Sequence, residues 1–228
     1  MQLYIANKNY SSWSLRPWLT LTELGIGFEE KLVPFDGATN WDRFRAFSPN
    51  GRVPCLVDGE TRVWESLAIV EYLAEREPRV WPEAAPARAW ARSAAAEMHA
   101  GFATLRGRCP MNVGLRMRLA AHPPELQHDL ARVDELWRDG LQRFGGPFLG
   151  GARFGAVDAF FAPVVFRIQT YGLAVSADAQ AYAARLLALP SLARWQREAL
   201  IEPWRDTAHE EQVRQSGTVL DDRRGTPA

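Results

Sequence analysis

Two patterns of apolar and polar residues divide this 228-residue chain into an N-terminal and a C-terminal part. In the first 80 residues, short apolar runs alternate with turn residues such as Asp58-Gly59, a pair typical of a tight hairpin. The runs predict strands over 3–6, 28–33, 53–57 and 61–64, and helices from near 12 to before 25 or 27 and from 65 to near 77. The element order is a βαβ half followed by a ββα half.

From about residue 86 the strand signals disappear. Apolar residues then recur at helical spacing over 86–107, 124–144, 155–171, 177–188 and 191–200. Residues 78–86 contain three prolines and are expected to link two domains. The predicted fold class is an α/β, thioredoxin-like domain over 1–80 followed by an all-α helical bundle over 86–211. Residues 212–228 lack periodicity and are expected to form a flexible tail.

One helix start in the second domain carries a folding signal. Gly155 stands at the expected N-cap and Asp158 follows three residues later, where a carboxylate meets free amides and the positive end of the helix. The helix then places Phe161, Val165 and Ile168 on one face. We interpret this segment as a core helix.

Charge and composition exclude several classes of partner. The chain has 27 basic and 27 acidic residues, so nucleic acid is not expected as a principal partner. No apolar run approaches 18 residues and the N-terminus has the pattern of a strand, so neither a membrane span nor a signal peptide is expected, and a cytoplasmic location is favoured. Cys55 and Cys109 are far apart and form no cluster with the four histidines, so we predict no disulfide framework and no metal.

The segment from residue 53 to residue 66 has the features of a peptide-binding site. Pro54 forces Val53 toward extended dihedrals, so that the backbone N–H and C=O of Val53 can pair with an extended ligand. Glu65 and Ser66 open a helix, whose first amides attract a carboxylate, while Glu65 suits an ammonium group. An ordinary hairpin followed by a capped helix is the structural alternative.

Four segments together resemble the cytosolic glutathione S-transferase superfamily, and the resemblance covers the chain from residue 1 to about 210. They are 10–18, 48–54, the helix start at 65–66, and 154–167. The resemblance implies a thioredoxin-like domain that binds glutathione, a helical domain that lines a hydrophobic co-substrate site, and a homodimer. It also implies that Val53, before the family's cis-proline at Pro54, pairs with the cysteinyl backbone of glutathione. Glu65 and Ser66 would hold the γ-glutamyl ammonium and carboxylate.

The resemblance assigns thiol activation to a hydroxyl in the loop after the first strand, where Ser11 and Ser12 both qualify. Trp13 stands where zeta-like and cysteine-type members carry cysteine, which argues against mixed-disulfide chemistry. Serine at this point acts as a hydrogen-bond donor to sulfur rather than as a nucleophile. Helix capping is the structural alternative for one of the two serines, and Arg16 is expected to orient the loop or to pair with an acid.

The co-substrate side is assigned to Trp13 and to the first helix of the second domain. Met98, Phe102 and Leu105 recur at helical spacing and are expected to form an apolar wall, with Arg106 or Arg108 reaching an anionic group. A helix-packing stripe is the alternative.

Three functions follow. The first is a glutathione transferase that activates the thiol for attack on a small hydrophobic electrophile. The second is a zeta-like, glutathione-dependent cis-trans isomerase of the maleylacetoacetate type, suggested by Ser11, Ser12 and the nearby arginines. The third is a non-catalytic glutathione-binding or scaffold protein, suggested by the bulk of Trp13 beside the serines.

Overall fold

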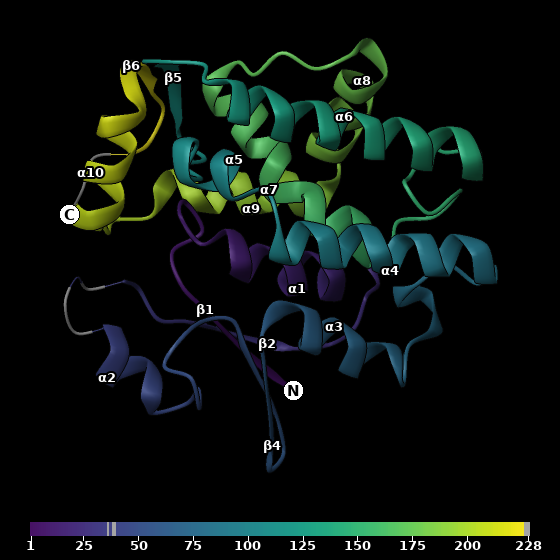
Figure 1. Ribbon diagram of the computed structural model, residues 1–228. Helices are drawn as coiled ribbons and strands as arrows, with labels where there is room; N and C mark the ends of the chain where they lie inside the picture. The colour runs from purple at the N-terminus through teal and green to yellow at the C-terminus, as the bar shows by residue number, and fades with distance from the viewer. Residues whose placement is uncertain (36, 38–39, 226–228) are drawn as a thin grey trace.

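A four-stranded mixed sheet and a larger group of helices form the two parts of the molecule in the computed structural model, which describes residues 1–35, 37 and 40–225 (Figure 1). The sheet order is β2-β1-β3-β4. β1 (Gln2–Ile5) pairs in parallel with β2 (Glu29–Leu32) and antiparallel with β3 (Cys55–Asp58), which pairs antiparallel with β4 (Thr61–Trp64). The four strands follow one another along the chain as predicted, and their pairing within the sheet is given by the structure.

Helices α1 (Ser12–Glu23), α2 (Asn40–Arg45) and α3 (Ser66–Ala74) complete the first part. α1 begins at Ser12 as expected and ends before Gly25, whose φ of 67° favours glycine. A short 3-10 helix, η2 (Pro78–Val80), lies in the proline-containing linker. The predicted combination of a thioredoxin-like domain with a helical C-terminal part is confirmed.

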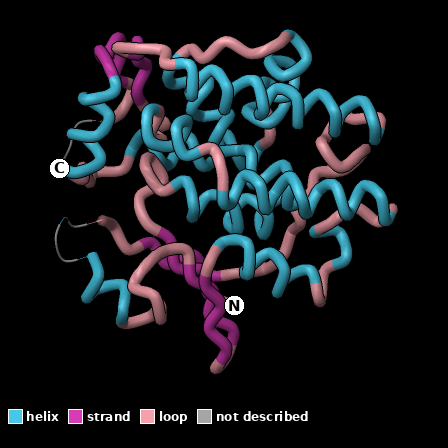
Figure 2. The backbone as a smooth tube through the Cα atoms, viewed as in Figure 1, coloured by secondary structure: helices cyan, strands magenta, loops and turns pink. Residues whose placement is uncertain are grey.

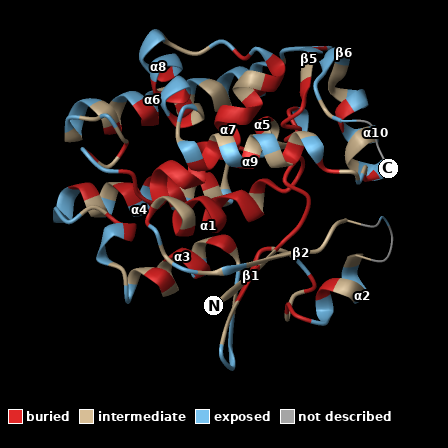
Figure 3. Ribbon diagram, turned by 180° about the vertical axis from the view of Figure 1, so that it is seen from behind, coloured by how far each residue is buried: buried red, intermediate tan, exposed pale blue. Residues whose placement is uncertain are grey.

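The second part is helical, with a small sheet added. Its helices are α4 (Ala85–Ala100), α5 (Ala103–Arg108), α6 (Pro124–Phe144), α7 (Ala156–Tyr171), α8 (Ala177–Leu187), α9 (Pro190–Ile201) and α10 (Thr207–Ser216). α7 is buried along almost its whole length and lies against α1, so these two helices join the two parts (Figure 3). Burial of apolar side chains across this contact is the main source of its stability.

Two details of the predicted second domain are wrong. The helix expected over 86–107 is interrupted at Gly101 and Phe102, because Phe102 adopts a left-handed conformation with φ 56°. The described part of the expected flexible tail, 212–225, continues α10 and then forms β6 (Gly217–Asp222), which pairs antiparallel with β5 (Leu115–Leu119). Figure 2 shows this second strand region on the opposite side of the molecule from the four-stranded sheet.

Asp158 stands at the start of α7 and is completely buried. Its Oδ2 accepts a hydrogen bond from the Gly155 backbone N–H at 3.0 Å. Its Oδ1 accepts one from the Leu149 N–H at 3.0 Å and one from the Tyr182 hydroxyl at 2.8 Å. One carboxylate therefore ties the helix start to the preceding loop and to α8.

The loop 7–10, which leads from β1 to the serines, is fixed by the C-terminal helices. The Glu202 carboxylate accepts hydrogen bonds from the backbone N–H of Lys8 at 2.6 Å and of Asn9 at 3.2 Å. The Lys8 ammonium pairs with Glu30 of β2 and Glu198 of α9. The position of the serine loop therefore depends on residues almost 200 positions away in the sequence.

Glu202 is expected to make the stability of the fold depend on pH. Burial raises the pKa of this carboxyl to about 7, although the hydrogen bonds from the two N–H donors act to lower it. The folded state then holds a proton that the unfolded chain releases above its ordinary pKa of 4.5, so stability falls as pH rises from about 4.5 to 7. In Glu202→Gln this part of the decline, roughly 3 kcal/mol at most, is expected to disappear in urea unfolding at pH 5 and pH 8.

The exposed turn residue Glu60, as Glu60→Gln, is the control and should leave the pH dependence as it is in the wild type. An equally steep decline in Glu202→Gln would show that Glu202 is not responsible for it.

Candidate active site

A cavity of about 520 Å³ lies between the sheet part and the helical part. It is lined by the serine loop, by the segment before β3, and by residues of α5, α7 and α10. Its lining side chains include Ser11, Ser12, Trp13, Val53, Arg106, Arg167 and His209. Segments distant in sequence thus meet where the sequence predicts a binding site.

The segment at Val53 has the predicted geometry. The Val53–Pro54 peptide bond is cis, and Val53 lines the cavity immediately before β3. Within the described residues, neither the backbone N–H nor the C=O of Val53 makes a hydrogen bond. Both groups are therefore available to an extended ligand.

Glu65 and Ser66 adopt an unusual conformation at the start of α3. Glu65 has φ 63° and ψ 146°, a combination that costs a non-glycine residue about 1–3 kcal/mol and often marks a functional site. Its Oε1 accepts a hydrogen bond from the Asn50 amide at 3.0 Å. The Ser66 hydroxyl is buried and has no hydrogen-bond partner among the described residues. A buried hydroxyl without a partner fits a site that receives a carboxylate.

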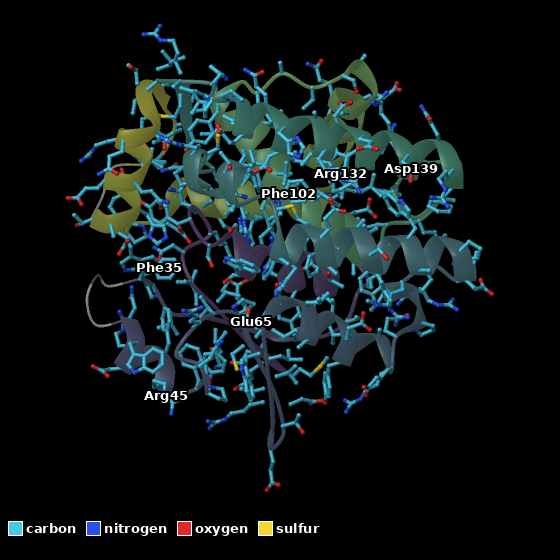
Figure 4. The ribbon with its side chains drawn as sticks, viewed as in Figure 1. Phe35, Arg45, Glu65, Phe102, Arg132 and Asp139 are labelled. Atoms are coloured by element: carbon cyan, nitrogen blue, oxygen red, sulfur yellow. The ribbon has the colours of Figure 1, made fainter. Side chains whose placement is uncertain are left out.

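These two residues are close to the cavity rather than part of its lining. Asn50 connects Glu65 to the cavity. Its side-chain amide donates to the Glu65 carboxylate, and the next residue, Gly51, lines the cavity. Figure 4 shows Glu65 at the boundary between the sheet part and the helices above it.

The two serines differ in their hydrogen bonds. The Ser11 hydroxyl bonds to the Ser14 hydroxyl at 2.7 Å, and the Ser14 oxygen also accepts from the Ala6 N–H at 3.3 Å. Ser12, the first residue of α1, lines the cavity and its hydroxyl has no partner among the described residues. Neither serine side chain caps α1, so the capping alternative does not apply to Ser11, the N-cap residue.

Tyr10 also lines the cavity, but its hydroxyl is occupied. It donates to the Glu210 carboxylate at 2.6 Å, and burial followed by this contact raises the pKa of Tyr10. The Tyr10 ring stacks on His209 of α10 at 5.0 Å between centroids, and His209 stacks on Phe35 at 4.7 Å. α10 therefore closes one side of the cavity.

The proposed co-substrate residues separate into two groups. Trp13 and Arg106 line the cavity. Met98 and Phe102 do not, so the prediction that they form its apolar wall is wrong. Both are buried in the hydrophobic core. The break at Gly101 also ends the helical stripe before Leu105.

Sequence reasoning missed several residues of the site. Asn50, Arg167, His209 and Gln212 received no functional role, although Asn50 orients Glu65 and the others line the cavity. For Arg167 a signal was available, since an arginine inside the apolar run 159–168 is unusual in a core helix. His209 and Gln212 lie beyond the helices that the periodicity predicts.

Over 1–35, 37 and 40–225, no group of three or more His, Cys, Asp or Glu side chains is arranged to hold a metal ion. In the same ranges no helix is long and apolar enough to cross a membrane. Cys55 and Cys109 are buried free thiols, and burial raises the pKa of each, to about 12 for Cys109.

Several known proteins are similar to this chain in sequence. Residues 10–76 match the family model described as the glutathione S-transferase N-terminal domain. Glutathione S-transferase GstB of Escherichia coli is 30% identical over 186 residues, which cover 73% of this chain and 83% of that protein. A probable maleylacetoacetate isomerase of Vibrio cholerae is 28% identical over 199 residues, covering 81% and 90%. The chain belongs to the glutathione S-transferase family, and the prediction of a glutathione transferase enzyme is confirmed.

Solved structures agree on the fold. A theta-class glutathione S-transferase of Xanthomonas axonopodis pv. citri with glutathione bound has a TM-score of 0.62 and 25% identity, covering 88% of this chain and 97% of that one. A Burkholderia glutathione transferase homolog with bound glutathione has a TM-score of 0.63 and 23% identity, covering 87% and 96%.

Proposed function

We propose that the protein binds glutathione in this cavity and that Ser12 activates the thiol for attack on a small electrophile. The observation that carries the proposal is the free hydroxyl of Ser12 in a cavity that also contains the unpaired backbone of Val53. Glutathione would pair its cysteinyl backbone with Val53 and direct its γ-glutamyl carboxylate to Ser66 and its ammonium to Glu65. The buried, unpartnered Ser66 hydroxyl supports this orientation.

Thiol activation needs a source of anion stabilisation. A free thiol titrates near 8.5, and lowering its pKa by two units requires about 2.7 kcal/mol of differential interaction. Ser12 can donate a hydrogen bond to the sulfur and lies at the N-terminus of α1, where the helix dipole favours negative charge. Ser11 is the weaker candidate because its hydroxyl is bonded to Ser14. We assign it a supporting role.

The isomerase reaction is the second candidate. The similarity to the probable maleylacetoacetate isomerase of Vibrio cholerae favours it, together with the adjacent Ser11 and Ser12. Glutathione-dependent isomerisation of a cis diacid ketoenol would support it, and absence of that activity in an enzyme that conjugates electrophiles would exclude it.

The proposal also includes a homodimer, a cytoplasmic location and a role in detoxification. Sedimentation measurements test the homodimer.

Calorimetric titration with glutathione tests the proposal. Binding heat and a thermal shift at millimolar glutathione are expected, because a ligand that binds only the folded state stabilises it. If glutathione at that concentration gave neither binding heat nor a thermal shift, the proposed site would be wrong.

Ser66→Ala is expected to weaken glutathione binding about tenfold or more, since a hydrogen bond to a charged group contributes about 1.5–3 kcal/mol. The stability of the unliganded protein should change by less than about 0.5 kcal/mol, because the hydroxyl has no partner to lose. Calorimetry and urea unfolding measure the two quantities. Ser93→Ala on α4, where the hydroxyl bonds only to Ala89 of its own helix, is the control. Equal glutathione affinity in both variants would remove Ser66 from the site.

A further inference from the structure

Three arginine side chains gather at the Trp13 end of the cavity. The guanidinium carbon of Arg16 lies 4.2 Å from the centroid of the Trp13 ring, and that of Arg106 lies 5.4 Å from it. Arg167 of α7 lines the same cavity as Trp13 and Arg106. Arg16 lies one helical turn after Ser12 on α1, so the group is adjacent to the proposed thiol site.

No carboxylate of the described residues forms an ion pair with any of these three arginines. Arg16 is 1% exposed, and its Nε and Nη1 atoms have no hydrogen-bond partner among the described residues. Arg167 is 4% exposed and donates only to the carbonyl oxygens of Cys109 and Pro163. Arg106 donates only to the carbonyl oxygen of His99. Buried charges normally have a charged partner, so this arrangement is unusual.

The surrounding charges do not neutralise the cluster. Burial lowers the pKa of Arg16 most, followed by repulsion from Arg167 and Arg106, while Glu65 opposes the shift. The charge of Asp129 partly opposes the lowering of the Arg106 pKa by burial. The Asp129 carboxylate itself accepts a hydrogen bond from the Leu105 N–H. Among the described lining residues there is no aspartate or glutamate. The Trp13 end of the cavity is therefore a region of positive potential with unused N–H donors.

We propose that Arg16, Arg106 and Arg167 select a second substrate that carries a carboxylate. This inference rests on the proposed function and names the class of electrophile. An incoming carboxylate would accept hydrogen bonds from Arg106 and Arg167 and would balance the charge of Arg16 behind Trp13. The glycyl carboxylate of glutathione is the other possible anion, but Arg52, next to Val53, offers a cation at the end of the cavity where the tripeptide is proposed to bind.

A matched pair of electrophiles tests the preference. 4-Chloro-3-nitrobenzoate and 4-chloro-3-nitrobenzamide have similar shapes and differ in charge. With either one the glutathione sulfur forms a bond to the ring carbon, the carbon–chlorine bond breaks, chloride leaves with the electron pair, and the thiol proton passes to solvent. After correction for the spontaneous rates, we expect kcat/KM for the acid to exceed that for the amide at least tenfold.

Two variants on the same helix locate the effect. Arg106→Met is expected to reduce the acid-to-amide ratio about tenfold, whereas Arg108→Met, an equal change of charge at an exposed position outside this cavity, should keep the wild-type ratio. Turnover of both electrophiles without preference, or equal ratios in the two variants, would overturn the inference and leave the proposed function intact. Absence of both glutathione binding and turnover would overturn the proposed function and the inference with it.

Binding measurements separate the two possible anions. In protein saturated with S-methylglutathione, whose glycyl carboxylate is already placed, 3-nitrobenzoate should bind at least tenfold more tightly than 3-nitrobenzamide. If Arg106→Met instead weakens S-methylglutathione binding and leaves this preference unchanged, the cluster serves glutathione and the inference is wrong. Arg16→Met is expected to reduce the preference without lowering Tm, because it removes a buried charge that has no ion-pair partner among the described residues. A lower Tm with an unchanged preference would assign Arg16 a structural role only and overturn its place in the site.

Discussion

Ser12→Ala is expected to lower kcat with a generic electrophile about 100-fold while leaving glutathione affinity nearly unchanged. Loss of one positioned hydrogen-bond donor to a developing or stabilised anion typically costs about 10²–10³ in kcat. Glutathione affinity should be preserved because its backbone and γ-glutamyl contacts are assigned to Val53, Glu65 and Ser66. Steady-state kinetics and calorimetric titration with glutathione measure the two quantities.

Ser11→Ala is the matched comparison, since the two serines are adjacent and both line the cavity. It should cost less than tenfold in kcat, because its hydroxyl bonds to Ser14. The thiol should also titrate at higher pH in Ser12→Ala than in the wild type, which the pH dependence of kcat/KM reports. A larger loss in Ser11→Ala would reverse the assignment of the two serines. Unaltered turnover in the double variant would refute any role for these hydroxyls.

The parts of the site that could be predicted from the sequence are those made by neighbouring residues. The Val53-Pro54 bond, the hairpin and the start of α3 depend on local conformational preferences, and the structure has all three. The start of α1 at Ser12 is equally local. The sequence does not separate Ser11 from Ser12, because the distinction depends on which hydroxyl Ser14 contacts in the folded loop.

The parts that could not be predicted depend on distant segments. Arg16, Arg106 and Arg167 come from three helices, and only the tertiary fold brings them together near Trp13. The expectation that Arg16 pairs with an acid is wrong for the described residues, where it lies between the rings of Trp13 and Phe160.

The strand β6 was missed for a related reason. Its residues are mostly exposed, so they show no alternation of apolar and polar residues that would indicate a strand. It forms because its backbone pairs with β5. The close approach requires glycine at its first position, since a Cβ on Gly217 would lie 2.1 Å from the carbonyl oxygen of Arg118.

Asp158→Ala is expected to lower the free energy of unfolding by about 3–5 kcal/mol, the largest effect on stability that we predict. The substitution leaves the N–H groups of Leu149 and Gly155 and the hydroxyl of Tyr182 buried without their acceptor. Each unsatisfied buried donor costs about 1–3 kcal/mol. Urea unfolding at pH 8 measures the change, because burial raises the pKa of Asp158 to about 6 and the wild-type carboxylate is ionised at that pH.

Asp178→Ala is the control for Asp158→Ala, since Asp178 also occupies the first turn of a helix but is exposed. It should cost less than about 1 kcal/mol, the size of a helix-dipole interaction at the surface. Asp158→Asn should fall between the two, because its amide oxygen still accepts from Leu149 and Tyr182 while its nitrogen cannot accept from Gly155. If all three variants unfold at the same urea concentration, the carboxylate does not stabilise the start of α7. The contact between α7 and α1 that positions the serines would then depend on apolar packing alone.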